Sequence, residues 1–325
     1  TQHTLIEVAE RFYQQGGELL LVDEVHNSPN WSKEIKEIYD TFPKLRVVFG
    51  GSSLLHILNA EADLSRRCLS YDMQGLSYRE YMIMYHNIHL PLVSLSDILH
   101  NSVAICEEVN KRCRPLEHFT HYLQQGYYPF GAEGFATYNQ RVENTVELLL
   151  NIELPQLRKV DIGNIRKLKA LLSVLASEVP MLVDTAKLST LLGISRNTLL
   201  AYLEYLDEAK LIKRLYSDDL SVKKMQKPDK ILMDNCNLLK VLALKEPNIG
   251  TLRETFFCNQ LGYQHQVEYS KQGDFLIDHQ ITFEIGGQAK EGKQVAAIED
   301  AYIVADDIEY SCGNKLPIWL FGLLY

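Results

Sequence analysis

Short apolar runs alternate with helically spaced apolar residues along the chain, and this alternation predicts a mixed α/β fold. The first clear run is Leu19–Val22, which follows the turn-forming pair Gly16-Gly17. Four consecutive aliphatic residues predict a strand that is buried on both faces. Residues 5–12 carry apolar side chains at helical spacing, and Leu45–Phe49 is a second apolar run. The chain is therefore expected to begin with a helix, a strand, a helix and a second strand.

Two adjacent acids, Asp23 and Glu24, follow the first strand directly. The carboxyl ends of parallel strands form the edge at which open α/β sheets bind their ligands. In nucleotide hydrolases, an acid at this place holds Mg²⁺ and a second acid can polarise the attacking water. The alternative is a buried strand followed by a solvated acidic turn.

A small polar turn, Gly50-Gly51-Ser52-Ser53, follows the second strand. If both strands are parallel, the hydroxyl of Ser52 or Ser53 is expected at the same edge as the two acids. Arg66 and Arg67 come shortly afterwards. A guanidinium group stays protonated and binds phosphate oxygens in pairs, which suits the stabilisation of charge on a transferring phosphate.

These segments, in this order, resemble the bacterial and archaeal AAA-type ATPases in which a P-loop domain is followed by a winged helix and a restriction-nuclease-like domain. The similar segments are the strand end at 21–26, Gly-Ser-Ser at 51–53, Leu-Ser-Arg-Arg at 64–67 and Leu-Ser-Tyr-Arg-Glu-Tyr at 76–81. The resemblance implies ATP hydrolysis with ATP and Mg²⁺. It would place Asp23 on the metal, Glu24 as the water-polarising base, Ser52 or Ser53 as the sensor, and Arg66 or Arg67 on the phosphates.

The phosphate-binding loop of that family is missing, because no G-x-x-x-x-G-K-[ST] sequence occurs in the chain. Without it, no backbone cradle and no lysine neutralise the β- and γ-phosphates. The family has this loop upstream of the Asp-Glu strand, and the chain begins at Thr1. We interpret the sequence as the C-terminal part of an ATPase that is itself inactive. Its sheet should lack the strand between Phe49 and a strand near 69–76, and the open edges predict self-association.

The rest of the chain is expected to form three further parts after the ATPase core. The four divisions are thus an ATPase core at 1–95, a helical lid at 96–160, a winged helix at 161–220 and a nuclease-like α/β domain at 221–325. Residues 95–151 show helical spacing of apolar side chains. The lid assignment of this stretch rests on the resemblance.

The winged helix is predicted from the order helix, helix, Gly193 turn, helix and strand between residues 165 and 217. Its candidate DNA contacts are Arg196, Asn197, Lys213 and Arg214. Three acids in the same helix oppose this hypothesis, since Glu204, Asp207 and Glu208 would face phosphates. Packing inside the protein or against a partner is the alternative, because a fold does not fix a function.

Three acids near the C-terminus follow the order seen in restriction-type nucleases, which is helix acid, strand Asp, hairpin and strand Glu. These residues are Glu254, Asp274 and Glu284. The nuclease lysine that activates water is expected two residues after the last acid, where this chain has Gly286. A retained fold with a degenerate, catalytically silent site is expected, although Lys290 could reach in. Acids that cap exposed strand ends are the plain alternative.

Composition narrows the possible partners. A net charge of -9, from 33 basic and 42 acidic residues, argues against broad nonspecific binding to nucleic acid. The six cysteines form no C-x-x-C pair, which favours reduced packing residues. No apolar run approaches the roughly 18 residues that a membrane span needs, and a cytoplasmic protein is expected.

Overall fold

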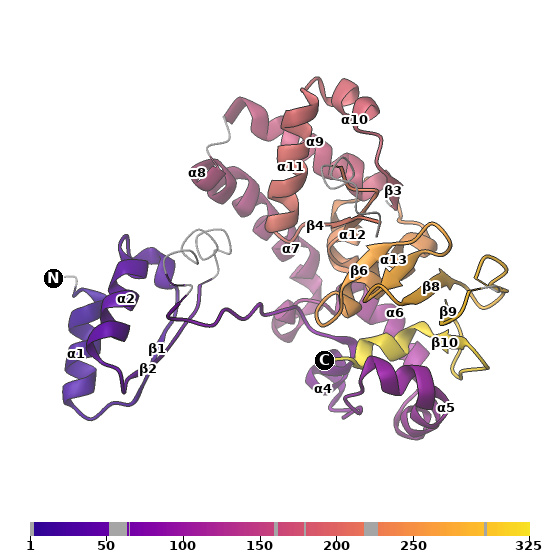
Figure 1. Ribbon diagram of the computed structural model, residues 1–325, viewed down its shortest axis with the longest axis horizontal. Helices are drawn as coiled ribbons and strands as arrows, with labels where there is room; N and C mark the ends of the chain where they lie inside the picture. Colours follow the sequence, from indigo (N-terminus) through magenta and orange to yellow (C-terminus); the bar gives the residue numbers. More distant parts are fainter. Residues whose placement is uncertain are drawn as a thin grey trace. The chain divides into compact units, whose positions relative to one another are not determined.

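The computed structural model describes residues 3–51, 64, 66–158, 162–178, 180–217, 227–295 and 298–325 (Figure 1), without the side chains of 156, 157, 162 and 181. The chain divides into two compact units. The first unit contains Thr1–Met73 and Ile152–Val160, and the second contains Gln74–Asn151 and Asp161–Tyr325. The four finer divisions expected from the sequence stay predictions.

The first unit is built around two parallel strands and two helices. Its elements are α1 (Leu5–Gln14), β1 (Leu19–Val22), a 3-10 turn η1 (Val25–Asn27), α2 (Trp31–Thr41) and β2 (Arg46–Phe49). Thr4 and Glu7 form a capping box that fixes the start of α1. β1 pairs with β2 in parallel, from Leu19 opposite Arg46 to Val22 opposite Phe49. The order of elements predicted from the sequence is confirmed.

One face of this sheet packs against the helices, and the other is exposed. Leu20 and Val47 contact a core of Ala9, Ile38 and Leu45. On the opposite face, Leu21 is 69% exposed and its cross-strand neighbour Val48 is 58% exposed. The prediction that the first strand is buried on both faces is therefore wrong. Burial on two faces requires a second covering layer, and the described part of the first unit supplies only one.

The expected third strand near 69–76 is also wrong, because residues 68–77 contain neither helix nor strand. A strand needs a neighbour to complete its hydrogen bonds, and in the described part of the first unit β1 and β2 form a sheet of two strands only. Leu69, Tyr71 and Met73 are consequently more than 80% exposed. Self-association through this sheet stays a prediction.

The second unit contains most of the helices. The described helical segments after residue 77 are α4 (Tyr78–His86), α5 (Leu95–Arg112), α6 (Pro115–Gln125), η2 (Pro129–Glu133), η3 (Phe135–Thr137), α7 (Tyr138–Leu148), η4 (Leu149–Glu153), α8 (Leu154–Arg158), α9 (Ile162–Glu178), α10 (Thr185–Leu192), α11 (Arg196–Glu208), α12 (Cys236–Leu242), α13 (Ile249–Leu261) and η5 (Ile318–Leu323). Of these, α8 and the end of η4 belong to the first unit. The predicted helical character of 95–151 is confirmed.

A three-stranded antiparallel sheet accompanies α9, α10 and α11. Its strands are β3 (Met181–Leu182), β4 (Ile212–Leu215) and β5 (Lys230–Met233), in the order β3-β5-β4. Asp184 caps α10, Gly193 ends it with φ of 59°, and Ser195 caps α11. β5 pairs with β4 over all four of its residues.

The second sheet has five strands: β6 (Val267–Tyr269), β7 (Phe275–Ile277), β8 (Ile281–Gly286), β9 (Ala301–Ala305) and β10 (Lys315–Pro317). Their order is β10-β9-β8-β7-β6, with an antiparallel β6-β7-β8 part and a parallel β8-β9-β10 part. Phe257 of α13 packs against Phe275, Phe283 and Phe321. After Pro317, the last residue of β10, the chain turns into η5.

Asn237, at the start of α12, joins three separate segments of the second unit. Its Oδ1 accepts hydrogen bonds from the backbone N–H of Tyr127, at 2.8 Å, and from the hydroxyl of Tyr138. Its Nδ2 donates to the carbonyl oxygens of Leu123, at 3.0 Å, and Tyr122, at 3.4 Å. Because Asn237 has no exposed surface, water cannot replace these partners.

Replacing Asn237 with alanine should lower the free energy of unfolding by about 3 kcal/mol, because a buried N–H and several carbonyl and hydroxyl groups lose their partner. The measurement is urea unfolding followed by circular dichroism. Asn139→Ala is the matched control, since Asn139 is exposed on α7. Equal stability losses in the two variants would contradict this role for Asn237.

Candidate functional site

The parallel pairing of β1 and β2 brings the two predicted ligand loops to one edge. The backbone N–H of Gly50 donates to Val22 O at 3.0 Å, and the N–H of Val25 donates to Gly50 O at 3.0 Å. The acids at 23–24 and the glycine turn at 50–51 are therefore neighbours. Ser52 and Ser53, the candidate sensors, lie outside the described residues.

The two acids differ in their surroundings. Asp23 is exposed, and its Oδ1 accepts a hydrogen bond from the N–H of Glu24 at 2.9 Å. Glu24 is half-buried in the left-handed region with φ of 49°, a conformation that non-glycine residues adopt at some energetic cost. Its Oε2 lies 3.4 Å from Nδ1 of His26. The tight turn thus points Asp23 toward solvent and holds Glu24 beside the histidine.

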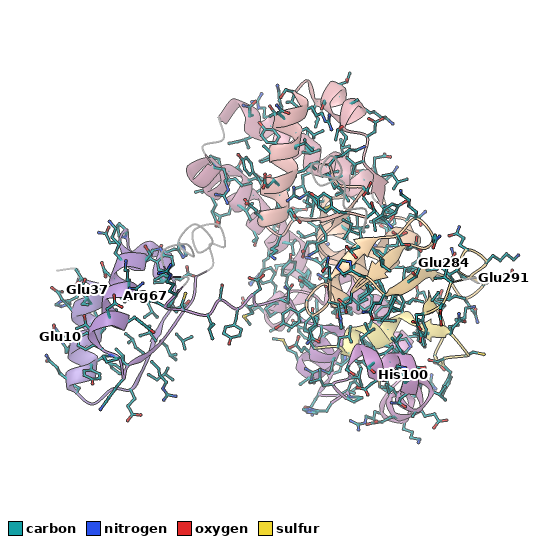
Figure 2. The ribbon with its side chains drawn as sticks, in the orientation of Figure 1. Glu10, Glu37, Arg67, His100, Glu284 and Glu291 are labelled. Carbon is teal, nitrogen blue, oxygen red and sulfur yellow. The ribbon has the colours of Figure 1, made fainter. Side chains whose placement is uncertain are left out.

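The two arginines are not equivalent. Arg66 is exposed. Arg67 lies against α2 (Figure 2), where its Nε and Nη2 donate to the two carboxylate oxygens of Asp40 at 3.0 and 3.1 Å. This guanidinium holds the pKa of the Asp40 carboxyl below its ordinary value. Arg67 would have to leave Asp40 before it could bind a phosphate, so Arg66 is the candidate that the geometry favours.

The four candidate DNA contacts fall into two groups. Arg196 and Asn197 are exposed in the first turn of α11. Arg214 instead bonds Asp207 through Nε at 2.9 Å, and Nζ of Lys213 lies 3.8 Å from the position that a Cβ on Gly262 would take. Arg214 is thus engaged by an acid, Lys213 lies near Gly262, and both residues are half-buried, whereas Arg196 and Asn197 are exposed.

Lys167, which lies at the Gly193 turn before α11, was not identified from the sequence. Its Nζ donates to Gly193 O at 3.0 Å, so that α9 adds a cation next to the start of α11. The sequence places Lys167 in the predicted helix, but only the packing of α9 beside the turn shows its proximity to Arg196.

The three C-terminal acids gather in the second unit. Phe275 is opposite Phe283 in the antiparallel pair, which puts Asp274 opposite Glu284 at the next position. Asp274 Oδ2 accepts from the N–H of Ile285 at 2.7 Å. Glu284 (Figure 2) is 1% exposed, and its Oε1 lies 2.9 Å from Nζ of Lys290. The expected juxtaposition of Asp274 and Glu284 is present.

Glu254 of α13 belongs to the same cluster and forms an ion pair with Lys230 of β5. Burial raises the pKa of the Glu254 carboxyl; the ammonium of Lys230 opposes this rise, and Asp274 adds to it. Lys230 was not predicted, because a lysine that begins an apolar strand carries no local signal of its partner. Within the described ranges, no three His, Cys, Asp or Glu side chains are arranged to hold a metal ion as they stand.

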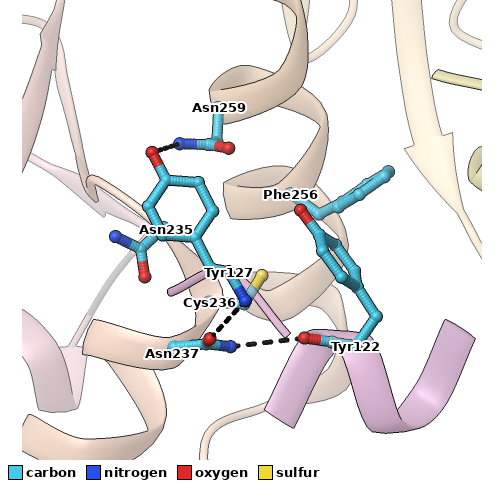
Figure 3. A pocket seen from close by; sticks show the side chains of 7 residues that line it. All are labelled: Tyr122, Tyr127, Asn235, Cys236, Asn237, Phe256 and Asn259. Carbon is cyan, nitrogen blue, oxygen red and sulfur yellow. Dashed lines mark hydrogen bonds between the residues drawn. The ribbon is translucent and has the colours of Figure 1, made fainter. Parts of the chain in front are cut away.

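A small cavity of about 10 Å³ lies beside Asn237 (Figure 3), which is roughly the space of one water molecule. It is lined by Tyr122, Tyr127, Asn235, Cys236, Asn237, Phe256 and Asn259. Asn259 Nδ2 donates to the Tyr127 hydroxyl at 3.2 Å and to Asp234 O at 3.0 Å. The cavity is too small for an organic ligand and belongs to the packing of the core.

All six cysteines are free, and three of them are buried. Burial raises the pKa of the Cys258 thiol to about 12, so this thiol is a packing group. None of the described helices combines the length and the apolar character that crossing a membrane requires.

Comparison with known proteins finds family matches for two stretches of the chain. Residues 1–82 match a family described as an AAA domain, and residues 116–248 match a domain of unknown function, DUF8612. At a coarse level, the chain is thus similar to AAA-type ATPases. It is also 26% identical, over 335 aligned residues, to the uncharacterized protein MJ1637 of Methanocaldococcus jannaschii. That alignment covers 94% of this chain and 70% of the relative. No solved structure matches the chain.

Asp234, which follows β5, gives a pH-dependent prediction. Burial raises the pKa of its carboxyl to about 6, against the opposing hydrogen bond from Asn235. An acid with a raised pKa in the folded state binds more protons when folded, so its contribution to stability falls as pH rises from about 4 to about 6. Asp234→Asn should leave stability at pH 4 nearly unchanged and raise it at pH 7.5, by at most about 3 kcal/mol.

Urea unfolding at both pH values measures this effect. Asp97→Asn is a control with the opposite expected effect, because hydrogen bonds from Ser94 lower the pKa of the Asp97 carboxyl. Removing this carboxylate should destabilise the protein at pH 7.5. A pH-independent effect of Asp234→Asn would contradict the assignment.

Proposed function

We propose that the first unit supplies the two acids of an ATP-hydrolysing site. Asp23 would bind Mg²⁺, since it is an exposed carboxylate and oxygen donors suit this ion. Glu24 would accept a hydrogen bond from the attacking water, with its turn fixed by the left-handed backbone and its carboxylate beside His26. The observation that carries the proposal is the hydrogen bonding of Val22, Gly50 and Val25 across one sheet edge.

The match of residues 1–82 to an AAA domain supports this proposal. Bound Mg²⁺ would neutralise charge on the phosphates. Arg66 is exposed and follows the turn at 50–53 in the sequence. It would contact the phosphate oxygens of the bound nucleotide. The phosphate cradle itself would come from a segment outside the 325 residues, because the chain has no P-loop sequence.

The chain alone should therefore bind Mg-ATP only weakly and should not hydrolyse it. Calorimetry with Mg-ATP tests this expectation, on the 325-residue chain and on a longer protein that includes the sequence encoded before Thr1. In the longer protein, Glu24→Gln should retain nucleotide binding and lower the hydrolysis rate roughly 100-fold or more, because the water loses its polarising acid.

Glu18→Gln is the matched control, because Glu18 is exposed just before the opposite end of β1. Hydrolysis unaffected by Glu24→Gln would contradict the role of Glu24. Micromolar binding to the 325-residue chain, lost in Asp23→Ala, would show a phosphate site that does not need the P-loop.

A second candidate function, DNA contact, is favoured by one observation. Lys167 lies at the turn before α11, where Arg196 and Asn197 are exposed. The order α9-β3-α10-α11-β4-β5 supports a winged-helix proposal. Binding should be weak, because few cations are available in a chain of net charge -9.

Gel shifts at about 50 and about 200 mM salt should show affinity falling roughly tenfold or more between the two, since phosphate contacts release counterions. Arg196→Ala and Lys167→Ala should weaken binding at low salt. Lys111→Ala, an exposed lysine of α5, is the control. Tight binding that is insensitive to Arg196→Ala and Lys213→Ala would exclude this surface.

A further inference from the structure

Three histidines meet where α4 packs against α6 in the second unit. His86 is the last residue of α4, and His118 and His121 lie one turn apart on α6. The ring centres of His86 and His118 are 4.2 Å apart. His86 and His121 are exposed and His118 is half-buried, so protons reach this cluster from solvent. Neither the proposed ATP site nor the proposed DNA contact uses these residues.

The hydroxyl of Tyr81 joins two of the histidines. Its oxygen lies 2.7 Å from Nδ1 of His121 and 3.2 Å from Nε2 of His86. Tyr81 is only 1% exposed, and burial raises the pKa of its hydroxyl to about 12. The hydroxyl therefore keeps its proton, and it has one hydrogen to donate.

This hydroxyl allows one proton to be added to the pair but not two. When both rings are neutral, one ring nitrogen accepts the Tyr81 hydrogen and the other donates to the Tyr81 oxygen. If one ring is protonated, it becomes the donor and the other ring accepts. If both are protonated, both facing nitrogens carry hydrogens, and the buried hydroxyl loses its acceptor. A buried donor without a partner is destabilising, so the second proton breaks the network.

The neighbours of His86 disfavour that second proton. Partial burial, followed by the charges of His118 and His121, lowers the pKa of the His86 imidazole below its ordinary value. On α6, Glu117 is exposed one turn before His121, and an acid at this spacing favours a cation. His121 is therefore expected to take the first proton and His86 to resist the second.

Among the described residues, the elements packed around the cluster add few titratable groups. Tyr85 packs on Tyr81 with ring centres 5.1 Å apart, and burial raises the pKa of its hydroxyl. Phe135 of η3 packs edge-on against the His121 ring. The apolar η5 contacts both helices and has no ionisable side chain. α12 also packs on α6, and its Lys240 is held in an ion pair. The charge of the cluster is thus set mainly by its own histidines.

We propose that this cluster is a pH-sensitive contact between α4 and α6, closed at neutral pH and opened in mildly acidic solution by protonation of a second histidine. The proposal depends neither on ATP hydrolysis nor on DNA binding. A histidine whose pKa is lowered in the folded protein binds fewer protons when folded. Its contribution to stability is present above the ordinary pKa of 6.5 and is lost as pH falls through the lower folded value.

The same helix contact holds the end of the segment that leads from the first unit into α4. Tyr122 of α6 donates its hydroxyl hydrogen to Leu76 O at 2.7 Å. Its ring also packs against that of Tyr81, with ring centres 5.4 Å apart. Separation of α4 from α6 would break this hydrogen bond. Acid is therefore expected to loosen the attachment of the joining segment to the second unit.

Hydrogen exchange followed by mass spectrometry tests the switch on the 325-residue chain, at about pH 7.5 and about pH 5, with EDTA present to remove metal ions. Exchange rates are divided by the intrinsic rates at each pH. In the wild-type chain, protection of the amides in α4 and α6 should fall roughly tenfold at the lower pH, because the buried hydroxyl loses its acceptor.

His121→Gln should remove this pH dependence. A glutamine amide can accept or donate but does not titrate, so the Tyr81 hydroxyl keeps a partner whichever charge His86 carries. His86→Gln should have the same effect from the other side of the hydroxyl. Comparison with the wild-type chain cancels the contributions of other titrating groups, such as Asp234. Circular dichroism melting identifies a variant that fails to fold, and the other variant then decides.

His100→Gln is the matched control, because His100 (Figure 2) is exposed on α5 and its Nδ1 lies 2.8 Å from Ser96 O in its own helix. It should keep the wild-type loss of protection. Equal protection of α4 and α6 at both pH values in the wild-type chain would overturn the proposal. A loss that persists in folded His121→Gln and His86→Gln would overturn it too, since other groups would then cause it.

Discussion

A buried amide must find every hydrogen-bond partner inside the protein, and the second unit depends on how Asn237 meets this requirement. Its two ends bond the last turn of α6, the segment that follows it and the first turn of α7. These hydrogen bonds together restrict the mutual placement of α6, α7 and α12. The match to DUF8612 runs from 116 to 248 and contains the whole network.

Buried charged groups of the second unit also find their partners inside the protein. Lys230 is 5% exposed, lies 4.7 Å from the centre of the Phe275 ring and pairs with Glu254. It starts β5, which pairs with β4, while Glu254 lies on the helix that packs against the five-stranded sheet. Tyr269 N also donates to Tyr216 O at 2.9 Å. The two sheets are consequently joined through polar contacts as well as apolar ones.

Local pattern was enough to predict most elements but not their surroundings. Leu19–Val22 was correctly predicted as a strand, because four aliphatic residues in a row say much about the backbone. They say nothing about how many layers cover it, and the exposure of Leu21 was missed.

Site residues were likewise predictable where local sequence places them and not where packing does. Adjacent residues such as Asp23 and Glu24 were found because the chain itself keeps them together. Lys230 was missed, because its ion pair with Glu254 joins segments that are well separated in sequence. Lys290 was discounted, because the lysine was expected at residue 286 and not in the loop after β8. The ion pair between Arg214 and Asp207 was also missed, since a strand pattern predicts alternation but not the partner of each side chain.

Tyr325 links the first helix of the second unit to the final residue described. Ser77 Oγ and Arg79 Nε donate to Tyr325 O at 2.6 and 3.0 Å, and Gln260 Nε2 donates to its hydroxyl at 3.2 Å. Residues 77 and 325 are 248 positions apart. During synthesis, the N-terminal end of α4 therefore lacks its hydrogen bonds to Tyr325 until nearly all of the described chain has left the ribosome. Contacts of such long sequence separation slow folding, so the start of α4 reaches its final hydrogen bonding only when the two ends of the second unit come together.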